Sequence, residues 1–169
     1  MQLFIVPQIQ KKGKLIVLKE VSELLSQMRK VLRGKIGDII AVQERENPTV
    51  RYEIQIEQRS DKNLEGRILK EQNLAVQERK ISMIVAMPNK WDKAELIVQK
   101  LAEIGVNEIV FRPAERSVIK QWNEKKAERL LKIAQEATEQ SRGIQIPSIS
   151  FCQKVEEAVK GMKVYIFDK

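Results

Sequence analysis

ISMIVAMPNKWDKAELIVQKLAEIGVNEIVF, residues 81–111, decides the fold of the second half of this chain. It opens on an apolar run at 81–87, continues with apolar residues at helical spacing over 92–104, and returns to an apolar run at 108–111. Short apolar runs favour buried strands, and the longer periodic segment favours a helix. Strands that alternate with helices predict a parallel sheet with both faces covered.

The residues that follow extend this pattern. Spacing predicts a second, longer helix over Asn123–Arg142 and a third strand over Lys163–Phe167. Asp92, with Glu95 three residues later, has the spacing of an N-cap in a capping box. Gly105 stands where the first helix needs a left-handed residue to end.

The first part of the chain predicts a small β-barrel with one helix. The helix lies between the second and third strands, with Ser22 as its expected N-cap and Gly34 as its stop. A polar stretch from 72 to 79 predicts two domains, 1–72 and 76–169. The expected barrel strands are five β-type runs separated by polar breaks: Gln2–Val6, Lys14–Leu18, Asp38–Val42, Val50–Ile56 and Leu64–Leu69.

The composition is that of a basic globular protein. The chain has 169 residues, 43% of them hydrophobic, and 31 Lys and Arg against 23 Asp and Glu give a net charge of +8. An excess of cations is consistent with contact to a phosphate backbone. The apolar runs are much shorter than the roughly 20 residues of a membrane-spanning helix. The N-terminus also lacks a signal-peptide pattern, so we expect a cytoplasmic protein without a membrane segment.

The scarcity of cysteine and histidine excludes several kinds of catalytic and metal site. Cys152 is the only cysteine and histidine is absent. This excludes an intrachain disulfide, a zinc cluster of His and Cys, and any catalytic triad that uses imidazole. No metal site is expected, and chemistry must come from carboxylates, Lys, Arg, backbone groups or a bound cofactor.

Ligands of open parallel sheets bind beyond the carboxyl ends of the strands, and three segments qualify: 88–93, 112–120 and 167–169. The loop PNKWDK, 88–93, has Lys90 and Lys93 beside an expected helix start, and an ordinary capped loop is the alternative interpretation. The loop RPAERSVIK, 112–120, follows the second strand. It offers three cations and a hydroxyl donor: Arg112, Arg116, Lys120 and Ser117.

Structural explanations stay open for the remaining cations. Arg116 can form an ion pair with Glu115 or Glu139, and Arg142 favours the dipole at the end of its helix. The cations of the barrel helix can form a nucleic-acid surface or simply its solvated face. These helix cations are Arg29, Lys30 and Arg33.

Four blocks of the chain resemble the RsmE family of ribosomal RNA methyltransferases. MRKVLRGKIGD, 28–38, resembles HLxxVLRxxxGD, although Gln27 and Met28 replace the family's His and Leu. LIVQKLAEIGV, 96–106, resembles LIVQKxTELGV, and ERSVIK, 115–120, resembles ERSVVK. EATEQSRGIQIP, 136–147, resembles EAAEQSGRxxxP. The resemblance implies an α/β fold in which a small PUA-like β-barrel that binds RNA precedes a SPOUT-type parallel-sheet domain with a trefoil knot.

The resemblance also implies an activity. It implies transfer of a methyl group from S-adenosylmethionine to N3 of a uridine in 16S rRNA of the small ribosomal subunit, by a homodimer. The family's donor site uses a GPEGG loop and an ILR-containing loop, so we expect most of that site beyond Lys169, which would leave this chain incomplete and alone inactive. The contacts expected within the chain are Met87 and Phe167.

The resemblance assigns provisional roles to the cations. Arg116 and Arg142 are the candidate catalytic residues, which would stabilise charge on the uracil oxygens, while the general base is not identified. The candidate RNA contacts are Arg29, Lys30, Arg33, Lys90, Lys93, Ser117 and Lys120. A second interpretation is an RNA-binding module that lacks the methyl-donor site and catalyses nothing.

Overall fold

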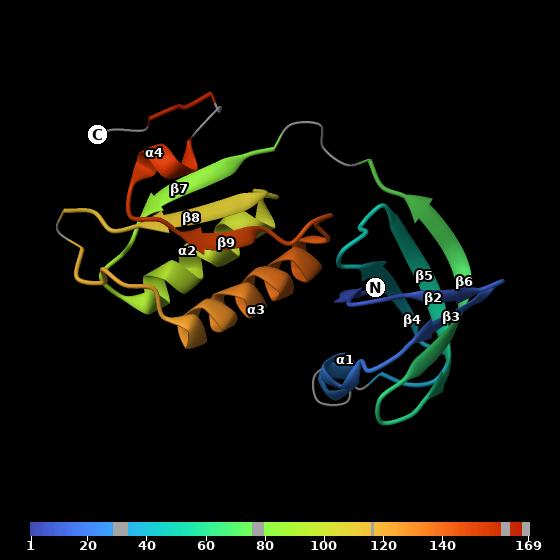
Figure 1. Cartoon of the computed structure of the whole chain (residues 1–169). Coiled ribbons are helices and arrows are strands. Elements are labelled where there is room, and N and C mark those ends of the chain that lie inside the picture. The colour runs from blue at the N-terminus through green and yellow to red at the C-terminus, as the bar shows by residue number, and fades with distance from the viewer. Residues whose placement is uncertain (29–33, 76–79, 116, 160–162, 167–169) are drawn as a thin grey trace. The chain divides into compact units, whose positions relative to one another are not determined.

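The computed structural model describes residues 1–28, 34–75, 80–115, 117–159 and 163–166. The chain divides into two compact units, Met1–Gln77 and Glu78–Lys169 (Figure 1). Each unit has its own sheet and its own hydrophobic core. Among the described residues, no helix has both the length and the apolar composition needed to cross a membrane.

The first unit is built on a six-stranded curved sheet with the order β1-β4-β5-β6-β3-β2 (Figure 1). Neighbouring strands pair antiparallel except β1 and β4, which run parallel. The bounds are β1 (Leu3–Val6), β2 (Gln10–Lys12), β3 (Leu15–Leu18), β4 (Ile39–Glu44), β5 (Val50–Arg59) and β6 (Leu64–Asn73). All five predicted strands are present. The polar edge strand β2 was not predicted, because Gln10–Lys12 contains no apolar residue.

One helix, α1 (Ser22–Gln27), packs its apolar residues into the core of this sheet. Leu25 and Met28 are fully buried with Ile54 and Leu64 of the strands. The prediction that Ser22 caps the helix is wrong: the N-cap is Val21, which makes no side-chain capping bond. Val21 instead donates its backbone N–H to the carbonyl of Lys62, so the strand connection fixes where the helix begins.

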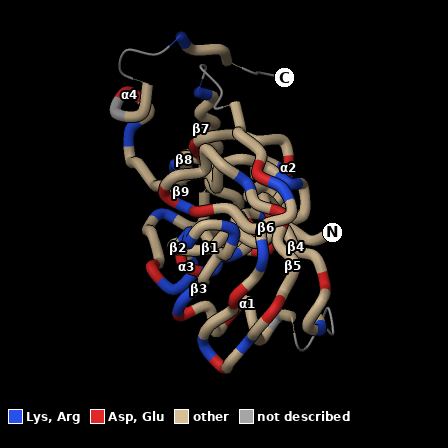
Figure 2. The backbone as a smooth tube through the Cα atoms, turned by 90° about the vertical axis from the view of Figure 1, so that its right-hand side faces the viewer, with Lys and Arg blue, Asp and Glu red and all other residues tan. Residues whose placement is uncertain are grey.

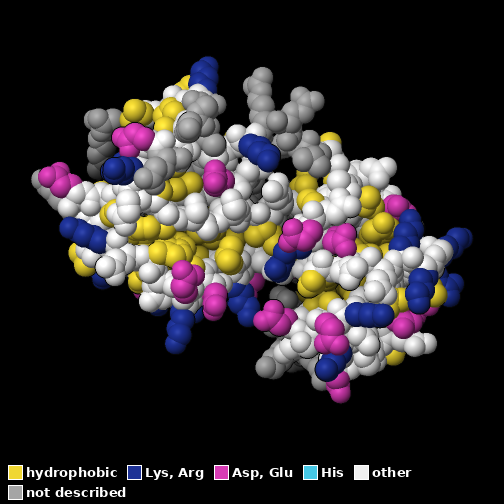
Figure 3. All heavy atoms as spheres, viewed as in Figure 1, with side chains coloured by type: hydrophobic (Ala, Val, Ile, Leu, Met, Phe, Trp, Pro, Cys, Tyr) yellow, Lys and Arg dark blue, Asp and Glu magenta, His cyan; other side chains and the backbone are white. Residues whose placement is uncertain are grey.

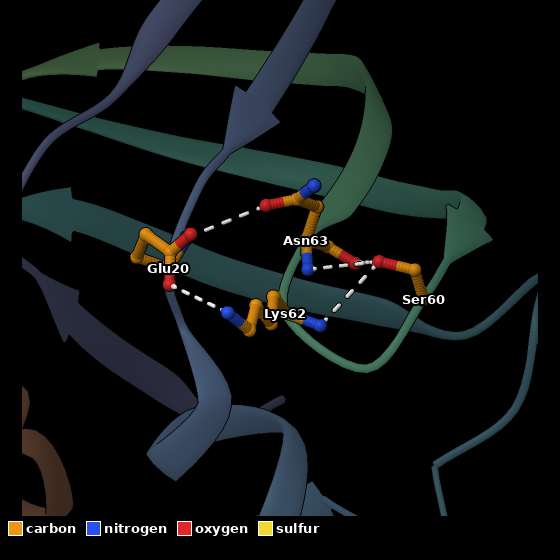
Figure 4. Close-up of polar contacts among 4 residues, drawn as sticks. All are labelled: Glu20, Ser60, Lys62 and Asn63. Carbon is orange, nitrogen blue, oxygen red and sulfur yellow. Dashed lines mark hydrogen bonds and ion pairs between the residues drawn. The ribbon is translucent and has the colours of Figure 1, made fainter.

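That connection is the β5–β6 loop, which is held by its own side chains (Figure 4). Ser60 Oγ accepts hydrogen bonds from the backbone N–H groups of Lys62 and Asn63, at 3.4 and 3.0 Å. Asn63 Oδ1 accepts from the backbone N–H of Glu20 at 3.4 Å, and the Lys62 ammonium lies 4.0 Å from the Glu20 carboxylate. The loop therefore anchors the entry to α1 by backbone and side-chain contacts together.

The second unit is a three-stranded parallel sheet with the order β7-β8-β9. Its strands are β7 (Ser82–Ala86), β8 (Glu108–Arg112) and β9 (Ser148–Phe151). Two helices, α2 (Trp91–Glu103) and α3 (Glu124–Ser141), lie side by side on the same face of the sheet (Figure 1). A short helix, α4 (Val155–Ala158), follows β9.

The core of this unit lies between the sheet and the two helices. Ile109 and Phe111 of β8 are fully buried against Ala94 and Val98 of α2 and Leu130 of α3. Alanine at the contact positions of both helices lets them approach the sheet closely, so small residues alternate with large ones across the core. The mixed α/β fold class that the sequence predicts is therefore confirmed.

Two predictions for this unit are wrong. The third strand is β9, and the described part of the expected strand, 163–166, lies outside the sheet with Tyr165 and Ile166 exposed. The N-cap of α2 is Lys90 and not Asp92, and Lys90 makes no side-chain capping bond. Asp92 stands one residue inside the helix, where its charge still favours the dipole. Gly105 does adopt the left-handed conformation expected after α2, with φ +80°.

Candidate functional site

Three chain segments meet at the carboxyl end of the parallel sheet. Strands β7, β8 and β9 run in the same direction, so the segments that follow Ala86, Arg112 and Phe151 leave the sheet at one edge, the left end of the second unit in Figure 1. This is the edge at which open α/β sheets bind ligands. We call these segments, 87–90, 113–123 and 152–154, the carboxyl-edge loops.

Ser117 joins the first two carboxyl-edge loops. Its hydroxyl donates to the carbonyl oxygen of Met87 at 3.0 Å and accepts from the backbone N–H of Ala114 at 2.9 Å. Ser117 is buried, with 6% of its surface exposed. The hydroxyl that the sequence suggested as an RNA contact is thus occupied by the protein, and its contact with RNA stays a prediction.

Further hydrogen bonds extend this connection to all three loops. Asn89 Oδ1 accepts from the backbone N–H of Val118 at 3.2 Å, and Gln153 Nε2 donates to the carbonyl of Lys120 at 3.4 Å. Sequence reasoning did not identify Asn89 or Gln153, because their partners lie about 30 residues away in the chain. The loops therefore form one hydrogen-bonded layer over the end of the sheet.

Three lysines on or beside this layer have no acidic partner in the described part of the chain. Lys90, Lys93 and Lys120 are exposed, and none forms an ion pair with any residue that the structure describes. Along both units, Lys and Arg are interspersed with Asp and Glu (Figure 2). At the carboxyl end of the sheet, apolar, cationic and acidic side chains share the surface (Figure 3). The three predicted lysines are thus brought to one end of the unit, with their charges available.

An aromatic cluster that sequence reasoning missed lies in the same place. Trp91 begins α2, Trp122 precedes the N-cap of α3, and Phe151 ends β9. The ring centroids of Trp91 and Trp122 are 6.2 Å apart at 55°, and those of Trp122 and Phe151 are 5.6 Å apart at 29°. The only signal in the sequence is that the chain's two tryptophans both fall next to these loops.

Arg142 is separated from the carboxyl-edge loops by the length of α3. The helix begins beside those loops and runs back for 18 residues, about 27 Å, before the chain enters β9 at the opposite edge. Arg142 is the C-cap and is left-handed, with φ +57°. Its catalytic role stays a prediction, and the structure does not bring it together with Lys90 or Lys120.

Three carboxylates of α2 and α3 have partners within the protein. Glu139 is buried in the last turn of α3 and accepts a hydrogen bond from Gln135 Nε2 at 2.9 Å. Glu103 is bonded to Lys100 within α2. On the helix surface, the Arg129 guanidinium binds both oxygens of Glu95 and lowers the pKa of that carboxyl below its usual value. None of the three belongs to a carboxyl-edge loop.

Several predicted site residues lie outside the described residues. One is the candidate catalytic residue Arg116, and another is the candidate donor contact Phe167. The others are the cations of the barrel helix, Arg29, Lys30 and Arg33. The other candidate donor contact, Met87, is described. Its side chain is buried in the core, its N–H donates to the Arg112 carbonyl, and its carbonyl accepts from Ser117.

The chain is similar to known proteins in both sequence and structure. The RNA methyltransferase domain family matches residues 76–168. The ribosomal RNA small subunit methyltransferase E of Bacillus subtilis (strain 168) is 37% identical over 83 residues, which are 47% of this chain and 32% of that protein.

Solved structures share the fold. A putative methyltransferase of Legionella pneumophila, solved with the cofactor SAM, has a TM-score of 0.76 at 25% identity over 95% of this chain and 66% of its own. A ribosomal RNA small subunit methyltransferase E of Neisseria gonorrhoeae, bound to S-adenosyl methionine, has a TM-score of 0.75 at 21% identity over 96% of this chain and 66% of its own.

This chain thus spans about two thirds of those solved structures, and the aligned segment spans one third of the B. subtilis protein. The family match covers more than half of the chain and includes all three strands of the parallel sheet with α2 and α3. It also includes three of the four blocks on which the sequence resemblance rests, at 96–106, 115–120 and 136–147. The chain belongs to the RNA methyltransferase domain family, as the resemblance to RsmE implied.

Proposed function

We propose that this chain acts in methylation of ribosomal RNA, with methyl transfer from S-adenosylmethionine to N3 of a uridine in 16S rRNA. The observation that carries the proposal is the placement of unpaired lysines on the carboxyl-edge loops of a domain of the RNA methyltransferase family. The names of the B. subtilis and N. gonorrhoeae relatives supply the substrate class. The same resemblance extends the proposal to a knotted domain and a homodimer.

The proposed RNA surface has two parts. Lys90, Lys93 and Lys120 would contact phosphates at the carboxyl end of the parallel sheet, because exposed ammonium groups gain affinity by releasing counterions from RNA. The barrel unit would add a second surface through its helix cations Arg29, Lys30 and Arg33.

S-adenosylmethionine is the proposed methyl donor, because two of the similar structures hold it. Met87 does not fit the part of a donor-binding residue: its side chain fills the core, and both of its backbone polar groups are bonded within the protein. We propose that the carboxyl-edge loops contribute a surface for RNA.

The reaction sets a requirement on the protein. Uridine N3 must lose its proton as it gains the methyl group, so negative charge develops on the uracil oxygens. Cations or N–H donors aimed at those oxygens lower the barrier. We propose Arg116 and Arg142 for this part, to be tested one at a time, since the end of α3 is far from the carboxyl-edge loops in one copy of the chain.

The test measures three properties of the same purified chain. Binding of S-adenosylmethionine is measured by calorimetry, binding of 16S rRNA by filter retention, and methyl transfer to small subunits by incorporation of labelled methyl groups. Mass spectrometry of the digested RNA then identifies the methylated atom. We expect RNA binding that weakens as salt rises, and 3-methyluridine as the product wherever methyl transfer occurs.

The outcomes separate the two functional interpretations. RNA binding with S-adenosylmethionine binding supports the enzyme, and 3-methyluridine establishes it. RNA binding without any affinity for S-adenosylmethionine assigns this chain to the RNA-binding module instead. Absence of RNA binding at low salt would refute both interpretations, and a different methylated base would refute the proposed substrate atom.

A further inference from the structure

The aromatic cluster at the carboxyl end of the sheet has a composition and placement that core packing alone does not require. Trp91, Trp122 and Phe151 come from three segments, yet the Trp122 ring lies 6.2 Å from that of Trp91 and 5.6 Å from that of Phe151, between centroids. All three side chains are only partly buried and line the rim of the core. Ring surface therefore remains in contact with solvent beside the carboxyl-edge loops.

The indole groups are also left with open hydrogen-bonding capacity. Neither Trp91 nor Trp122 donates its indole N–H to a residue that the structure describes. No buried side-chain polar atom is left unpaired in the described part of the chain, so both N–H groups reach solvent. A tryptophan that serves only the core would bury its ring and satisfy this donor within the protein.

Cations accompany each ring along the chain. Lys90 precedes Trp91, Lys120 lies two residues before Trp122, and Lys154 lies three residues after Phe151. Each of the three lysines is exposed and free of ion pairs with the described residues. Partly exposed aromatic rings with flanking lysines are a combination that binds single-stranded nucleic acid, through base stacking and phosphate contact.

The cluster is held in place before any ligand arrives. The Ser117–Met87, Val118–Asn89 and Gln153–Lys120 hydrogen bonds connect the loops that bear the three rings. A platform that is already ordered does not lose loop entropy on binding, so more of the stacking energy appears as affinity.

We propose that the cluster of Trp91, Trp122 and Phe151 binds an unpaired RNA base by stacking, while Lys90, Lys120 and Lys154 hold the phosphates on either side of it. The proposal rests on the proposed function and deepens it, because it specifies an unpaired nucleotide as what the carboxyl-edge loops recognise. A base inside a duplex has its faces covered by its neighbours, so the site selects loops, bulges and strand ends.

Tryptophan fluorescence tests the proposal directly, because both tryptophans of the chain belong to the cluster. The variant W91F leaves Trp122 as the only fluorescent indole, and W122F leaves Trp91. In both variants the phenylalanine keeps an aromatic ring at the substituted position. We expect a short oligouridine strand to quench the emission of both variants in a saturable way. An abasic strand of equal length carries the same phosphates and should leave the emission unchanged at the same occupancy.

The affinity measurement uses the same strands. Trp122→Leu should weaken oligouridine binding roughly 5- to 150-fold, with the salt dependence of binding unchanged because no cation is lost. Circular dichroism checks that the variant is folded. If the variant does not fold, the wild-type chain still tests the proposal, because its affinities for the uridine and abasic strands can be compared. Equal affinity of the abasic and uridine strands for the wild-type chain would overturn the proposal.

Two other outcomes have distinct meanings. If the chain binds structured 16S rRNA with the expected salt dependence while neither tryptophan responds, the stacking site is refuted and the proposed function stands. If emission changes with protein concentration and not with RNA, the cluster is a contact between copies of the chain, which also overturns the proposal. Failure to bind any RNA removes the proposed function together with the site.

Discussion

Arg142 is one of two non-glycine residues with a positive φ in the described part of the chain, and the other is Glu20. Arg142 ends α3 in the left-handed region at φ +57°, where a residue with Cβ is disfavoured. Its backbone N–H bonds to Glu139, and that of Gly143 bonds to Thr138, which closes the helix end. A Cβ on Gly143 would meet the Thr138 methyl at 3.0 Å. Gly143 is therefore needed because its backbone lies close to Thr138, and the left-handed residue at this helix end is Arg142 instead.

Arg142→Gly should stabilise the second unit. Glycine adopts positive φ without a steric cost, so we expect the free energy of unfolding to rise by about 0.5–1 kcal/mol, measured by urea denaturation. Gln140→Gly, inside the same helix, is the matched control and should lower it by about 1 kcal/mol. A destabilised Arg142→Gly would mean that the contacts of the arginine side chain outweigh its backbone strain.

Ser117 gives a second prediction at the residue scale. Ser117→Ala removes a buried hydroxyl and leaves the Met87 carbonyl and the Ala114 N–H without their partner. Unpaired buried groups of this kind cost about 1–3 kcal/mol, so thermal unfolding should occur at a lower temperature. Ser150→Ala, at an exposed position of β9, is the control and should have little effect. Equal stability of the two variants would show that water replaces the hydroxyl.

At the scale of elements, the α2–α3 pair is joined on its outer surface by one ion pair. The Arg129 guanidinium contacts both carboxylate oxygens of Glu95, Nε to Oε1 at 2.5 Å and Nη2 to Oε2 at 2.9 Å. The Arg129 side chain is 63% exposed and that of Glu95 18%. Hydrogen bonding and charge at Arg129 lower the pKa of Glu95, and the same contacts raise the pKa of Arg129. The pair joins two helices that share a core. Because the contact requires an ionised Glu95, its contribution to the free energy of unfolding should depend on pH.

Glu95→Gln tests this dependence. A carboxyl whose pKa is lowered by folding stabilises the protein above its unfolded pKa, and the stabilisation is lost as pH falls through the lowered folded pKa. We therefore expect the variant to be less stable than the wild type at neutral pH and equally stable in acid, by denaturation at a series of pH values. Glu103→Gln, which breaks the pair within α2, is the control for a contact that joins no second helix. A difference that persists in acid would contradict an ionic origin.

The elements also show what a sequence pattern can and cannot predict. Apolar runs predicted β7 and β8, because both strands contribute apolar side chains to the core between the sheet and the helices. The pattern missed β9, since its alternating Ser, Ile, Ser and Phe put only two side chains inward. It favoured residues 163–167 instead, which resemble a strand in composition, although their described part lies exposed. Local strand propensity does not predict which of two apolar segments pairs with the sheet.

At the scale of the whole molecule, the candidate site is a product of topology. The lysines of the two loops were predicted to lie together because parallel strands end at one edge. The aromatic cluster was not, since Trp91, Trp122 and Phe151 are about 30 residues apart and no motif joins them. The same topology places Arg142 at the opposite edge, which the resemblance alone did not indicate. The sequence therefore predicts the residues of the site better than their grouping.

Salt dependence of RNA binding tests this grouping. Lys90→Ala and Lys120→Ala should each reduce the slope of log affinity against log salt by about 1, because each removes one phosphate contact. Lys100→Ala is the matched control: it lies at the other end of α2 and is already paired with Glu103. An equal reduction of the slope in all three variants would show that RNA binding depends on the net charge of +8 and not on the position of the lysines.

The parallel pairing of β1 with β4 has a consequence for how the first unit comes together during synthesis. Leu3 pairs with Ala41, 38 residues later, whereas β5 and β6 are joined by a short hairpin loop. Closing a longer loop costs more chain entropy, so local hairpins form early and distant strand pairs late. Strand β1 is synthesised before β4, so it must wait for β4 before its backbone can form this pairing. Until then its apolar side chains, Leu3 to Val6, are what a chaperone would meet.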